Sequence, residues 1–513
     1  MGDIDRGQGR ATGRVGRLAR AGTVAVTLVA ALGLAGPTAN AQEVPAVPAD
    51  PAEPALAQAD PRHPVLPPAP LPPAPPVATQ IDPLAFRPST RDADGVREVR
   101  SATPLKLVAV TWTGTAPDSV ELRSTDAAGR WGTWTALDTV SSERDDLSVR
   151  EPQGTDPVWV GDRTAVEVRA TREGTSVTDD VRVVCIDPGQ GANDPAIGAL
   201  DPEPEAPAAP AYVTRAQWGA DESMMTWPPE TTPTTRAVTI HHTAESNDYG
   251  PADSPGIVRA IYAYHARTQG WGDIGYNALV DKYGTIFEGR AGGLDRSVVA
   301  AHAGGFNRET FGIAMMGNLE TTLPTPPQFS STAALAAWKL GGLYRDPAER
   351  IELTSSGGGT SRFPKGRVAT VPALFAHRDV GSTVCPGDAA YGQMDALRVR
   401  VAERIAAAAP DVRSAWSTDR SVLGEPTRVE SPTADGTGRT TEFEHGTVYW
   451  TPRTGAWAVS GLIADAWRAQ GAERSALGYP TSAEYDVPAG RQQNFEHGAL
   501  TWNRTSNAVL PPP

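Results

Sequence analysis

Cysteine is scarce in this chain, which has only Cys185 and Cys385 among its 513 residues. Two thiols allow at most one disulfide bridge, and an exported protein could form it. Cys185 lies in the apolar, strand-like run 181–186, which is typical of a small buried side chain. Cys385 lies among polar residues and glycines close to His377, so we expect it to have another role than pairing with Cys185.

An excess of basic charge is also missing. The formal net charge is −14 and the sequence pI is about 5.1. Nucleic-acid binding without sequence preference needs a basic surface. The composition therefore argues against a nucleic-acid partner and favours a soluble protein.

Long apolar runs are absent after the N-terminal segment. That segment begins with five arginines between residues 6 and 20, continues with the apolar stretch 21–35 and ends on Ala39-Asn40-Ala41. This order predicts a secretory signal that is cleaved before Gln42. A membrane anchor is the alternative, but a spanning helix needs about 20 apolar residues. We therefore expect an exported protein with no membrane span in the mature chain.

The rest of the chain divides into modules separated by proline-rich stretches. Residues 61–76 hold nine prolines, which favours an extended polyproline-type spacer. A second stretch, rich in Pro, Ala and acidic residues, covers 188–210. We predict a signal peptide at 1–41, a Pro-rich linker at 42–80, a β-rich domain at 90–187, a second linker at 188–210, a mixed α/β domain at 211–410 and repeats at 414–513.

The β-rich domain shows short strand-like runs and contains no histidine between residues 97 and 187. The runs are 105–112, 120–123 and 166–169, and polar, glycine-containing turns separate them. This spacing predicts a β-sandwich-like fold. Because nothing in it resembles a catalytic group, we interpret it as a binding or spacing module.

Region 211–410 alternates between strand and helix patterns. Ser254 and Pro255 begin a helix whose apolar residues recur at helical spacing until Gly270 closes it. The other predicted elements are strands at 236–240 and 311–316, a hairpin of 276–280 with 285–288, and helices at 331–344 and 388–408. Alternating strands and helices predict an α/β domain with a central mixed sheet and flanking helices.

The C-terminal region contains an internal repeat. Leu423-Gly424-Glu425-Pro426 returns as Leu477-Gly478-Tyr479-Pro480, and Phe443-Glu444-His445-Gly446 returns as Phe495-Glu496-His497-Gly498. Two unlike motifs that recur with nearly the same offset indicate a duplication. His445 and His497 could be metal ligands in isolation, but as members of a repeated turn we interpret them as structural.

Five of the eight histidines and Cys385 fall in the mixed domain. A catalytic zinc is bound by about three protein ligands and keeps one open position for water, and imidazole and thiolate both suit it. His377 and Cys385 lie eight residues apart in a loop that Gly381 and Pro386-Gly387 allow to fold back. The third ligand would come from His241 or His242, whose side chains point to opposite faces of a strand.

Four segments of this domain resemble the peptidoglycan recognition protein and type 2 N-acetylmuramoyl-L-alanine amidase family. The segments are Ile240-His241-His242-Thr243-Ala244, Asp273-Ile274-Gly275-Tyr276-Asn277, Phe287-Glu288-Gly289-Arg290, and His377-Arg378-Asp379-Val380 continued by Cys385-Pro386-Gly387-Asp388. Ala216-Gln217-Trp218-Gly219-Ala220 resembles the family's opening motif. The C-terminal repeats resemble LGFP repeats of envelope proteins, with Glu425 where the name expects Phe.

The resemblance implies a role for individual side chains. It implies that His241, His377 and Cys385 bind zinc, that the Tyr276 phenol lies near the metal-bound water, and that Thr383 can donate to the oxyanion. His242 is then a packed neighbour. The segment from His302 to Asn307 resembles a family loop, which implies that His302 and Asn307 lie on the groove floor and contact substrate. His265 is expected to be packed.

The same resemblance implies a secreted zinc amidase of the bacterial cell envelope. Its reaction would cleave the amide between the lactyl group of N-acetylmuramic acid and L-alanine in peptidoglycan, during wall turnover or cell separation. The repeats would anchor it to the envelope, with another envelope polymer as a further partner. The alternatives are a non-catalytic peptidoglycan-binding protein and a structural envelope protein. Non-catalytic relatives typically lose the zinc cysteine, so Cys385 favours the enzyme.

Overall fold

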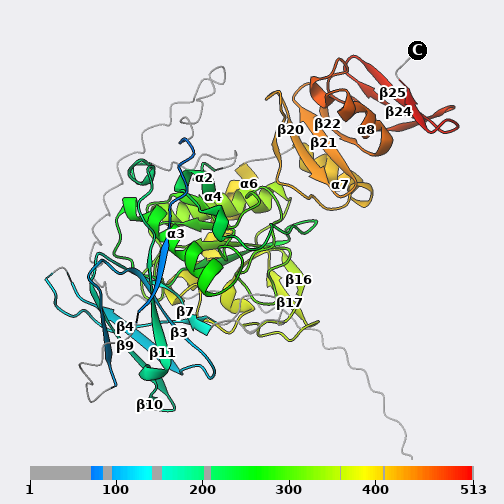
Figure 1. The fold of residues 1–513 in the computed structure, drawn as a ribbon. Coiled ribbons are helices and arrows are strands. Elements are labelled where there is room, and N and C mark those ends of the chain that lie inside the picture. Colours follow the sequence, from blue (N-terminus) through cyan, green and yellow to red (C-terminus); the bar gives the residue numbers. More distant parts are fainter. Residues whose placement is uncertain are drawn as a thin grey trace, which may run out of the picture. The chain divides into compact units, whose positions relative to one another are not determined.

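The computed structural model describes residues 71–84, 95–126, 128–140, 153–200, 210–358, 360–407 and 411–510 (Figure 1). The predicted signal peptide at 1–41 and most of the predicted linker at 42–80 lie outside these residues. Within the described residues, no helix combines the length and apolarity that crossing a membrane requires.

The β-rich domain consists of two antiparallel sheets around a shared apolar core. One sheet has the order β1-β11-β3-β7-β6, with β8 also paired to β3, and the other has the order β10-β9-β4-β5, with β2 paired to β9. Val120 and Leu122 of β4 and Val166 and Val168 of β9 are buried in this core, as the alternation of the sequence predicts. The first sheet comprises β1 (Gln80–Leu84), β3 (Lys106–Trp112), β6 (Thr139–Val140), β7 (Gln153–Thr155), β8 (Val158–Gly161) and β11 (Val181–Asp187). The second comprises β2 (Arg97–Arg100), β4 (Ser119–Ser124), β5 (Thr135–Ala136), β9 (Ala165–Arg172) and β10 (Thr175–Ser176), and the short helix η1 (Thr178–Asp180) precedes β11.

Cys185 lies in β11 inside this core, and neither it nor Cys385 in the next domain forms a disulfide bridge. Burial raises the pKa of the Cys185 thiol to about 12. The alternative of a Cys185–Cys385 disulfide is therefore wrong for this structure.

The central domain has a five-stranded mixed sheet with the order β14-β13-β15-β12-β18. β12 runs parallel to both β15 and β18, β13 runs parallel to β15, and β14 closes an antiparallel hairpin with β13. This confirms the predicted mixed sheet. The strands are β12 (Ala237–His242), β13 (Ala278–Val280), β14 (Ile286–Glu288), β15 (Thr310–Met315) and β18 (Leu374–Ala376).

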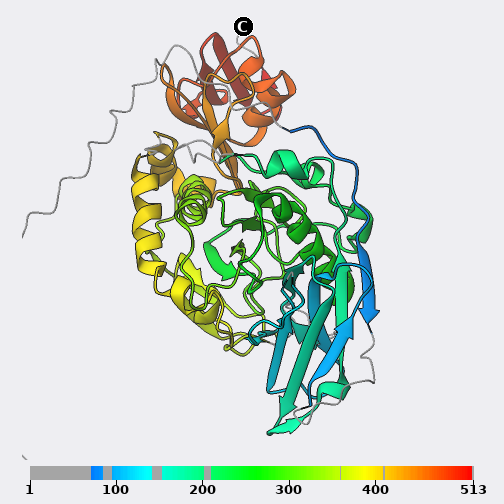
Figure 2. The same cartoon turned by 90° about the vertical axis from the view of Figure 1, so that its left-hand side faces the viewer.

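Helices cover both faces of this sheet. Phe311 and Ile313 of β15 pack with α4 (Pro326–Gly342) and α6 (Met394–Ala407), whereas Ala314 packs in the core that contains α3 (Ser254–Ala263). The pair α4 and α6 lies side by side (Figures 1 and 2). The remaining elements are α1 (Asp194–Ile197), α2 (Arg215–Trp218), η2 (Glu222–Met224), η3 (Pro251–Asp253), the π-helical turn η4 (Tyr264–Thr268), the hairpin β16 (Arg350–Thr354) with β17 (Val368–Pro372), η5 (His377–Asp379) and α5 (Asp388–Tyr391).

Parts of the two predicted linkers are packed rather than extended in solvent. Residues 71–79 lie along α2, where the backbone N–H of Val77 donates to the carbonyl of Gly219 (3.0 Å). In the second linker, both carboxylate oxygens of Asp194 accept from the guanidinium of Arg259 in α3, at 2.9 and 2.6 Å. Proline and alanine content alone does not show such docking, because it depends on a partner distant in sequence.

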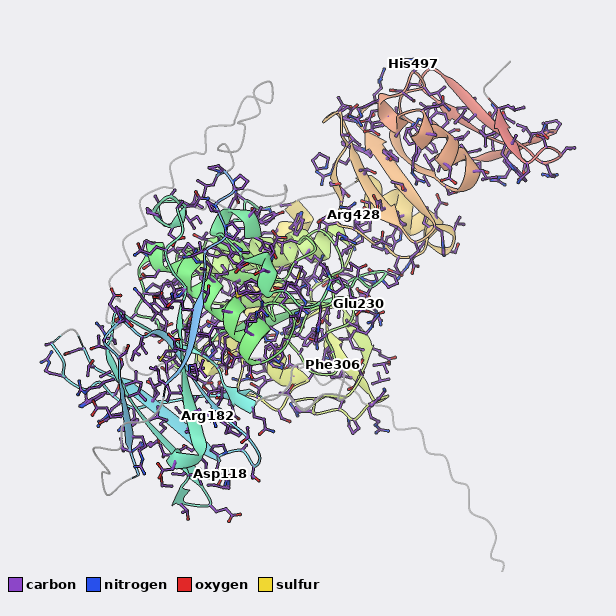
Figure 3. All side chains as sticks on the ribbon, in the orientation of Figure 1. Asp118, Arg182, Glu230, Phe306, Arg428 and His497 are labelled. Carbon is purple, nitrogen blue, oxygen red and sulfur yellow. The ribbon has the colours of Figure 1, made fainter. Side chains whose placement is uncertain are left out.

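The C-terminal region has two similar four-stranded sheets. In each, the motif glutamate holds the neighbouring turn: Glu444 accepts from the N–H of Glu425, and Glu496 accepts from the N–H of Tyr479, both at 3.0 Å. His445 and His497 are exposed in these turns, which agrees with a structural interpretation (His497 is labelled in Figure 3). The elements are α7 (Asp411–Leu423), β19 (Ser431–Pro432), β20 (Arg439–Phe443), β21 (Gly446–Thr451), β22 (Gly455–Val459), α8 (Gly461–Ala469), η6 (Ala472–Arg474), β23 (Tyr485–Val487), β24 (Gly490–Phe495), β25 (Gly498–Asn503) and β26 (Ala508–Leu510).

Candidate functional site

His241, His377 and Cys385 meet at one edge of the central sheet. His241 lies near the end of β12, and His377 follows directly after the neighbouring parallel strand β18. The carboxyl ends of parallel strands share one edge, which is where α/β proteins commonly build their sites. One ligand atom from each residue lies within 4.8 Å of the others, and all three side chains are buried. Cys385 Sγ lies 3.6 Å from His241 Nδ1.

The loop from His377 to Cys385 folds back on itself, as its glycines predict. The N–H of Gly381 donates to the carbonyl of His377 (2.8 Å), and the N–H of Arg378 donates to the carbonyl of Cys385 (3.0 Å). A Cβ at position 381 would lie 2.8 Å from His377 Nε2, so only glycine leaves the ring its space. The eight-residue spacing thus brings both side chains to one point.

His242 faces away from this group and belongs to another one. The N–H of Leu319 donates to His242 Nδ1 (3.2 Å), and Nε2 faces Asp138 Oδ2 at 3.8 Å. Asp138, His242 and Glu320 form the second group of potential metal ligands among the described residues. Because Nδ1 accepts a hydrogen bond, the proton of the neutral ring is on Nε2, which then has no lone pair for a cation. The geometry therefore favours the group that contains His241, and not the group that contains His242, as the metal site.

The histidines of the site are held in the neutral form. Burial keeps the pKa of His241 well below its ordinary value, and the neighbouring His377 is the second largest cause of this shift. Burial also lowers the pKa of His377 and of His302 to about 3. Neutral imidazole is the form that binds a metal ion.

A buried carboxyl group near the end of β12 gives a prediction about pH. Glu245 is 1% exposed, accepts from the Thr243 hydroxyl (3.1 Å), and its Oε2 has no hydrogen-bond partner among the described residues. Burial raises its pKa from 4.5 to about 8. Between these two values the folded protein keeps a proton that the unfolded chain loses, so this contribution to stability is lost as pH rises from about 4.5 to about 8.

We expect the wild type to lose roughly 2 to 3 kcal/mol of stability between pH 6 and 9 relative to Glu245→Gln. Urea unfolding of both proteins at the two pH values measures this difference. Glu352→Gln, at an exposed position of β16, is the control and should follow the wild type. Parallel pH curves for wild type and Glu245→Gln would contradict the assignment.

Tyr276 and Thr383 lie beside the three-residue group. The Tyr276 ring is 5.4 Å from the His241 ring between centroids, and the side chain is 8% exposed. The Thr383 hydroxyl accepts from the N–H of Cys385 (3.1 Å), which leaves its own proton available to donate elsewhere. The structure thus brings both predicted catalytic residues to the site.

His302 and Asn307, which the sequence predicts to contact substrate, are buried and make hydrogen bonds inside the protein. Both are 1% exposed, as His241 is. His302 Nδ1 is 3.0 Å from His241 Nε2, and Asn307 Oδ1 accepts from the N–H groups of His302 and Ala303 at 2.7 and 2.9 Å. These contacts are internal, and the run of small residues after His302 reflects a tight turn rather than an open surface.

His265, which the sequence predicts as packed, is buried and lies next to the tyrosine loop. Its Nδ1 accepts from the N–H of Gly275 (3.0 Å), and its ring is 5.6 Å from that of Tyr276 between centroids. It belongs to the π-helical turn at the end of α3, a distortion that often marks functional sites. The sequence pattern showed the helix but gave no sign of this turn.

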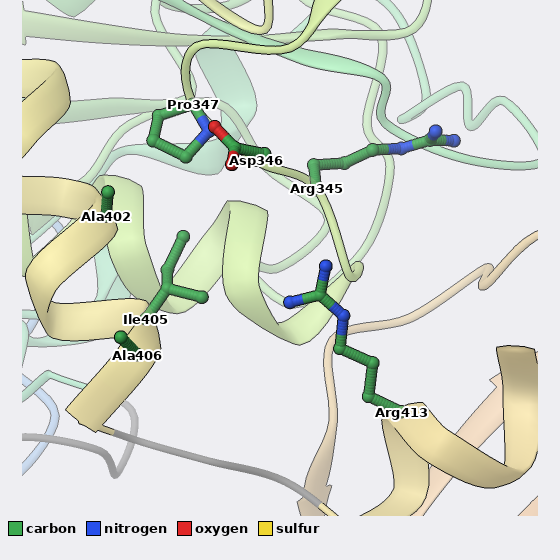
Figure 4. A pocket seen from close by; sticks show the side chains of 7 residues that line it. All are labelled: Arg345, Asp346, Pro347, Ala402, Ile405, Ala406 and Arg413. Carbon is green, nitrogen blue, oxygen red and sulfur yellow. The ribbon is translucent and has the colours of Figure 1, made fainter.

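The cavity drawn in Figure 4 has a volume of about 230 Å³ and contains none of these residues. It is lined by Arg345, Asp346, Pro347, Ala402, Ile405, Ala406 and Arg413. These residues come from the segment that follows α4, from α6 and from the start of α7, and they include no histidine or cysteine.

Comparison with protein families gives three matches along the chain. Residues 66–211 match the family described as Rv3811 N-terminal galactose-binding domain-like. Residues 231–388 match the N-acetylmuramoyl-L-alanine amidase family, and residues 423–475 and 477–510 match the LGFP repeat.

Individual relatives align with the central domain. Peptidoglycan-recognition protein SC2 of Drosophila simulans is 33% identical over 148 residues, which are 29% of this chain and 66% of that protein. The human N-acetylmuramoyl-L-alanine amidase is 34% identical over 134 residues, which are 26% of this chain and 19% of that protein. Among solved structures, Drosophila PGRP-LB has a TM-score of 0.29 and 26% identity, covering 36% of this chain and 92% of that one. The chain spans about two thirds of the length of the first of these relatives.

The fold and the family matches define a multidomain protein whose central unit is an α/β amidase domain. Residues 231–388 of this domain match the N-acetylmuramoyl-L-alanine amidase family, which confirms the resemblance of the sequence motifs. A galactose-binding-like domain precedes it, and LGFP repeats follow it.

Proposed function

We propose that this protein is an exported, zinc-dependent N-acetylmuramoyl-L-alanine amidase that cleaves the lactyl–L-Ala amide of peptidoglycan. The observation that carries the proposal is the buried group of His241, His377 and Cys385 at the sheet edge of an amidase-family domain. Two imidazole nitrogens and one thiolate sulfur are a donor set that suits zinc. Three protein ligands leave a fourth position open, as in catalytic rather than structural zinc sites.

Zinc bound there would lower the pKa of a coordinated water towards about 7 and polarise the scissile carbonyl. The protein side chains orient the amide and stabilise the charge that develops on it. The phenol ring of Tyr276 lies beside His241, and the Thr383 hydroxyl lies beside the N–H of Cys385. A hydroxyl aimed at a developing oxyanion contributes through a charge-assisted hydrogen bond.

A non-catalytic peptidoglycan-binding role is the second candidate, because peptidoglycan-recognition proteins are among the relatives. The complete group of two histidines and one cysteine, with Tyr276 beside it, supports the enzyme instead. We further propose that the LGFP repeats hold the enzyme in the cell envelope, through peptidoglycan or another envelope polymer.

Digestion of purified peptidoglycan by the zinc-loaded full chain tests the proposed activity. We expect new amino groups that belong to L-alanine at the ends of released stem peptides, without new reducing sugar ends. A chelator should abolish their release, and added zinc should restore it. Binding to peptidoglycan with no release under these conditions would favour the non-catalytic candidate.

Replacing Tyr276 with phenylalanine tests the role of the hydroxyl. Phenylalanine keeps the ring that packs near His241 and His265, so we expect zinc content and stability close to the wild type. Loss of one transition-state hydrogen bond should lower kcat by about 10²- to 10³-fold. The control is Tyr283→Phe, in the β13–β14 turn, which removes a hydroxyl bonded to the Tyr249 carbonyl (2.8 Å) and should keep kcat. An unchanged kcat in Tyr276→Phe would exclude the role.

A further inference from the structure

His302 is connected to the candidate zinc site through a chain of hydrogen bonds inside the protein. Its Nδ1 lies 3.0 Å from His241 Nε2, and its Nε2 lies 3.3 Å from the Thr310 hydroxyl. The Thr310 hydroxyl also contacts the carbonyl oxygen of Phe306, in the turn labelled in Figure 3. His241, His302 and Thr310 are each at most 2% exposed.

The direction of each of these hydrogen bonds follows from the last acceptor in the series, the carbonyl oxygen of Phe306. A carbonyl oxygen only accepts, so the Thr310 hydroxyl donates to Phe306 and accepts from His302 Nε2–H. A neutral ring has one N–H, so His302 Nδ1 is an acceptor, and His241 Nε2 must donate to it. The lone pair of His241 is then on Nδ1, the atom 3.6 Å from Cys385 Sγ.

The surrounding backbone is shaped to hold the His302 ring in this position. Asn307 Oδ1 fixes the turn by accepting from the N–H groups of His302 and Ala303. Gly312 of β15 lies against the ring, and a Cβ at this position would be 2.5 Å from it. Any side chain at position 312 would therefore displace His302.

We propose that His302 is a positioning residue that sets the tautomer of His241, so that His241 Nδ1 is the atom that binds zinc. This inference rests on the proposed function. Hydrogen-bonded partners of ligand histidines fix the ring orientation and raise its basicity, and their removal typically weakens metal binding by about 10- to 100-fold. His302 thus acts through His241 and does not contact substrate.

The test compares zinc affinity, measured by competition with a chromophoric chelator, in three full-length proteins. His302→Asn places an amide oxygen near the position of Nδ1 and should keep zinc affinity within about threefold of the wild type. His302→Leu removes the acceptor and should weaken zinc binding by about 10- to 100-fold. Lys339→Met is the control for general destabilisation, since this buried lysine donates to the carbonyls of Leu294 and Arg296 and not to the site. Its zinc affinity should equal that of the wild type.

Equal zinc affinity in His302→Leu and wild type would overturn the inference, as would an equal loss in the Leu and Asn variants. Should His302→Leu fail to fold, Thr310→Val takes its place in the test. We expect this variant to bind zinc about threefold to tenfold more weakly than the wild type. Unchanged zinc affinity would overturn the proposed chain of hydrogen bonds. A wild type that binds no zinc would instead reject the proposed function.

Discussion

Replacing Cys385 with alanine is expected to abolish zinc binding and to lower amidase activity by about a thousandfold or more. The thiolate is the only anionic donor of the group, and its removal leaves two neutral imidazoles, His241 and His377. Loss of a direct ligand should exceed the roughly 10- to 100-fold effect typical of a ligand's hydrogen-bonding partner. Zinc content of the purified protein and release of stem peptides measure the two effects.

Cys185→Ala is the matched control, because it removes the other thiol of the chain. Cys185 is buried in the core of the β-rich domain, so its loss leaves a small cavity but touches no residue of the site. We expect its zinc content and activity to equal those of the wild type. A Cys385→Ala protein that retains one zinc per chain and full activity would remove Cys385 from the site.

The largest expected effect on stability comes from breaking the buried ion pair between Asp194 and Arg259. The Arg259 side chain is 1% exposed and the Asp194 side chain 13%, and the guanidinium also donates to the carbonyl of Trp218 (2.8 Å). Asp194→Ala leaves a buried cation without its carboxylate, which typically costs about 3 to 5 kcal/mol. Chemical unfolding should show this loss in the transition of the central domain.

Asp179→Ala provides the comparison for this prediction. Asp179 pairs with Arg97 at 2.7 Å, but its side chain is 61% exposed, so water replaces much of the interaction. We expect a loss of no more than about 1 kcal/mol. Equal stability of Asp194→Ala and wild type would mean that residues 188–200 behave as the loose linker that their composition predicts.

The mixed sheet could be predicted because its strands and helices leave local patterns. The predicted ends of the helices differ from the observed ends. Helix α4 begins at Pro326, earlier than the predicted 331, since Thr325 caps it by accepting from the N–H of Gln328 (3.3 Å). The single helix predicted at 388–408 is divided into α5 and α6. Caps and interruptions depend on a few hydrogen bonds, which apolar periodicity does not report.

The candidate site, too, could be predicted from the sequence only in part. The family motifs selected His241, His377, Cys385, Tyr276 and Thr383, and the structure brings all five together. His302 and Asn307, which the family motifs predict to contact substrate, are both 1% exposed. The motifs do not report this burial, because exposure is set by the packing of distant segments. The role of Gly312 had no signal in the sequence, since it depends on how closely β15 approaches the His302 ring.

X-ray absorption at the zinc edge on the zinc-loaded full chain tests the central claim most directly. The account predicts one sulfur at about 2.3 Å and two imidazole nitrogens with one oxygen at about 2.0–2.1 Å. Purified Cys385→Ala, which should bind no zinc, should give no zinc absorption edge above background. A wild-type spectrum with no sulfur, or with a shell of oxygen atoms only, would contradict a zinc ion held by His241, His377 and Cys385.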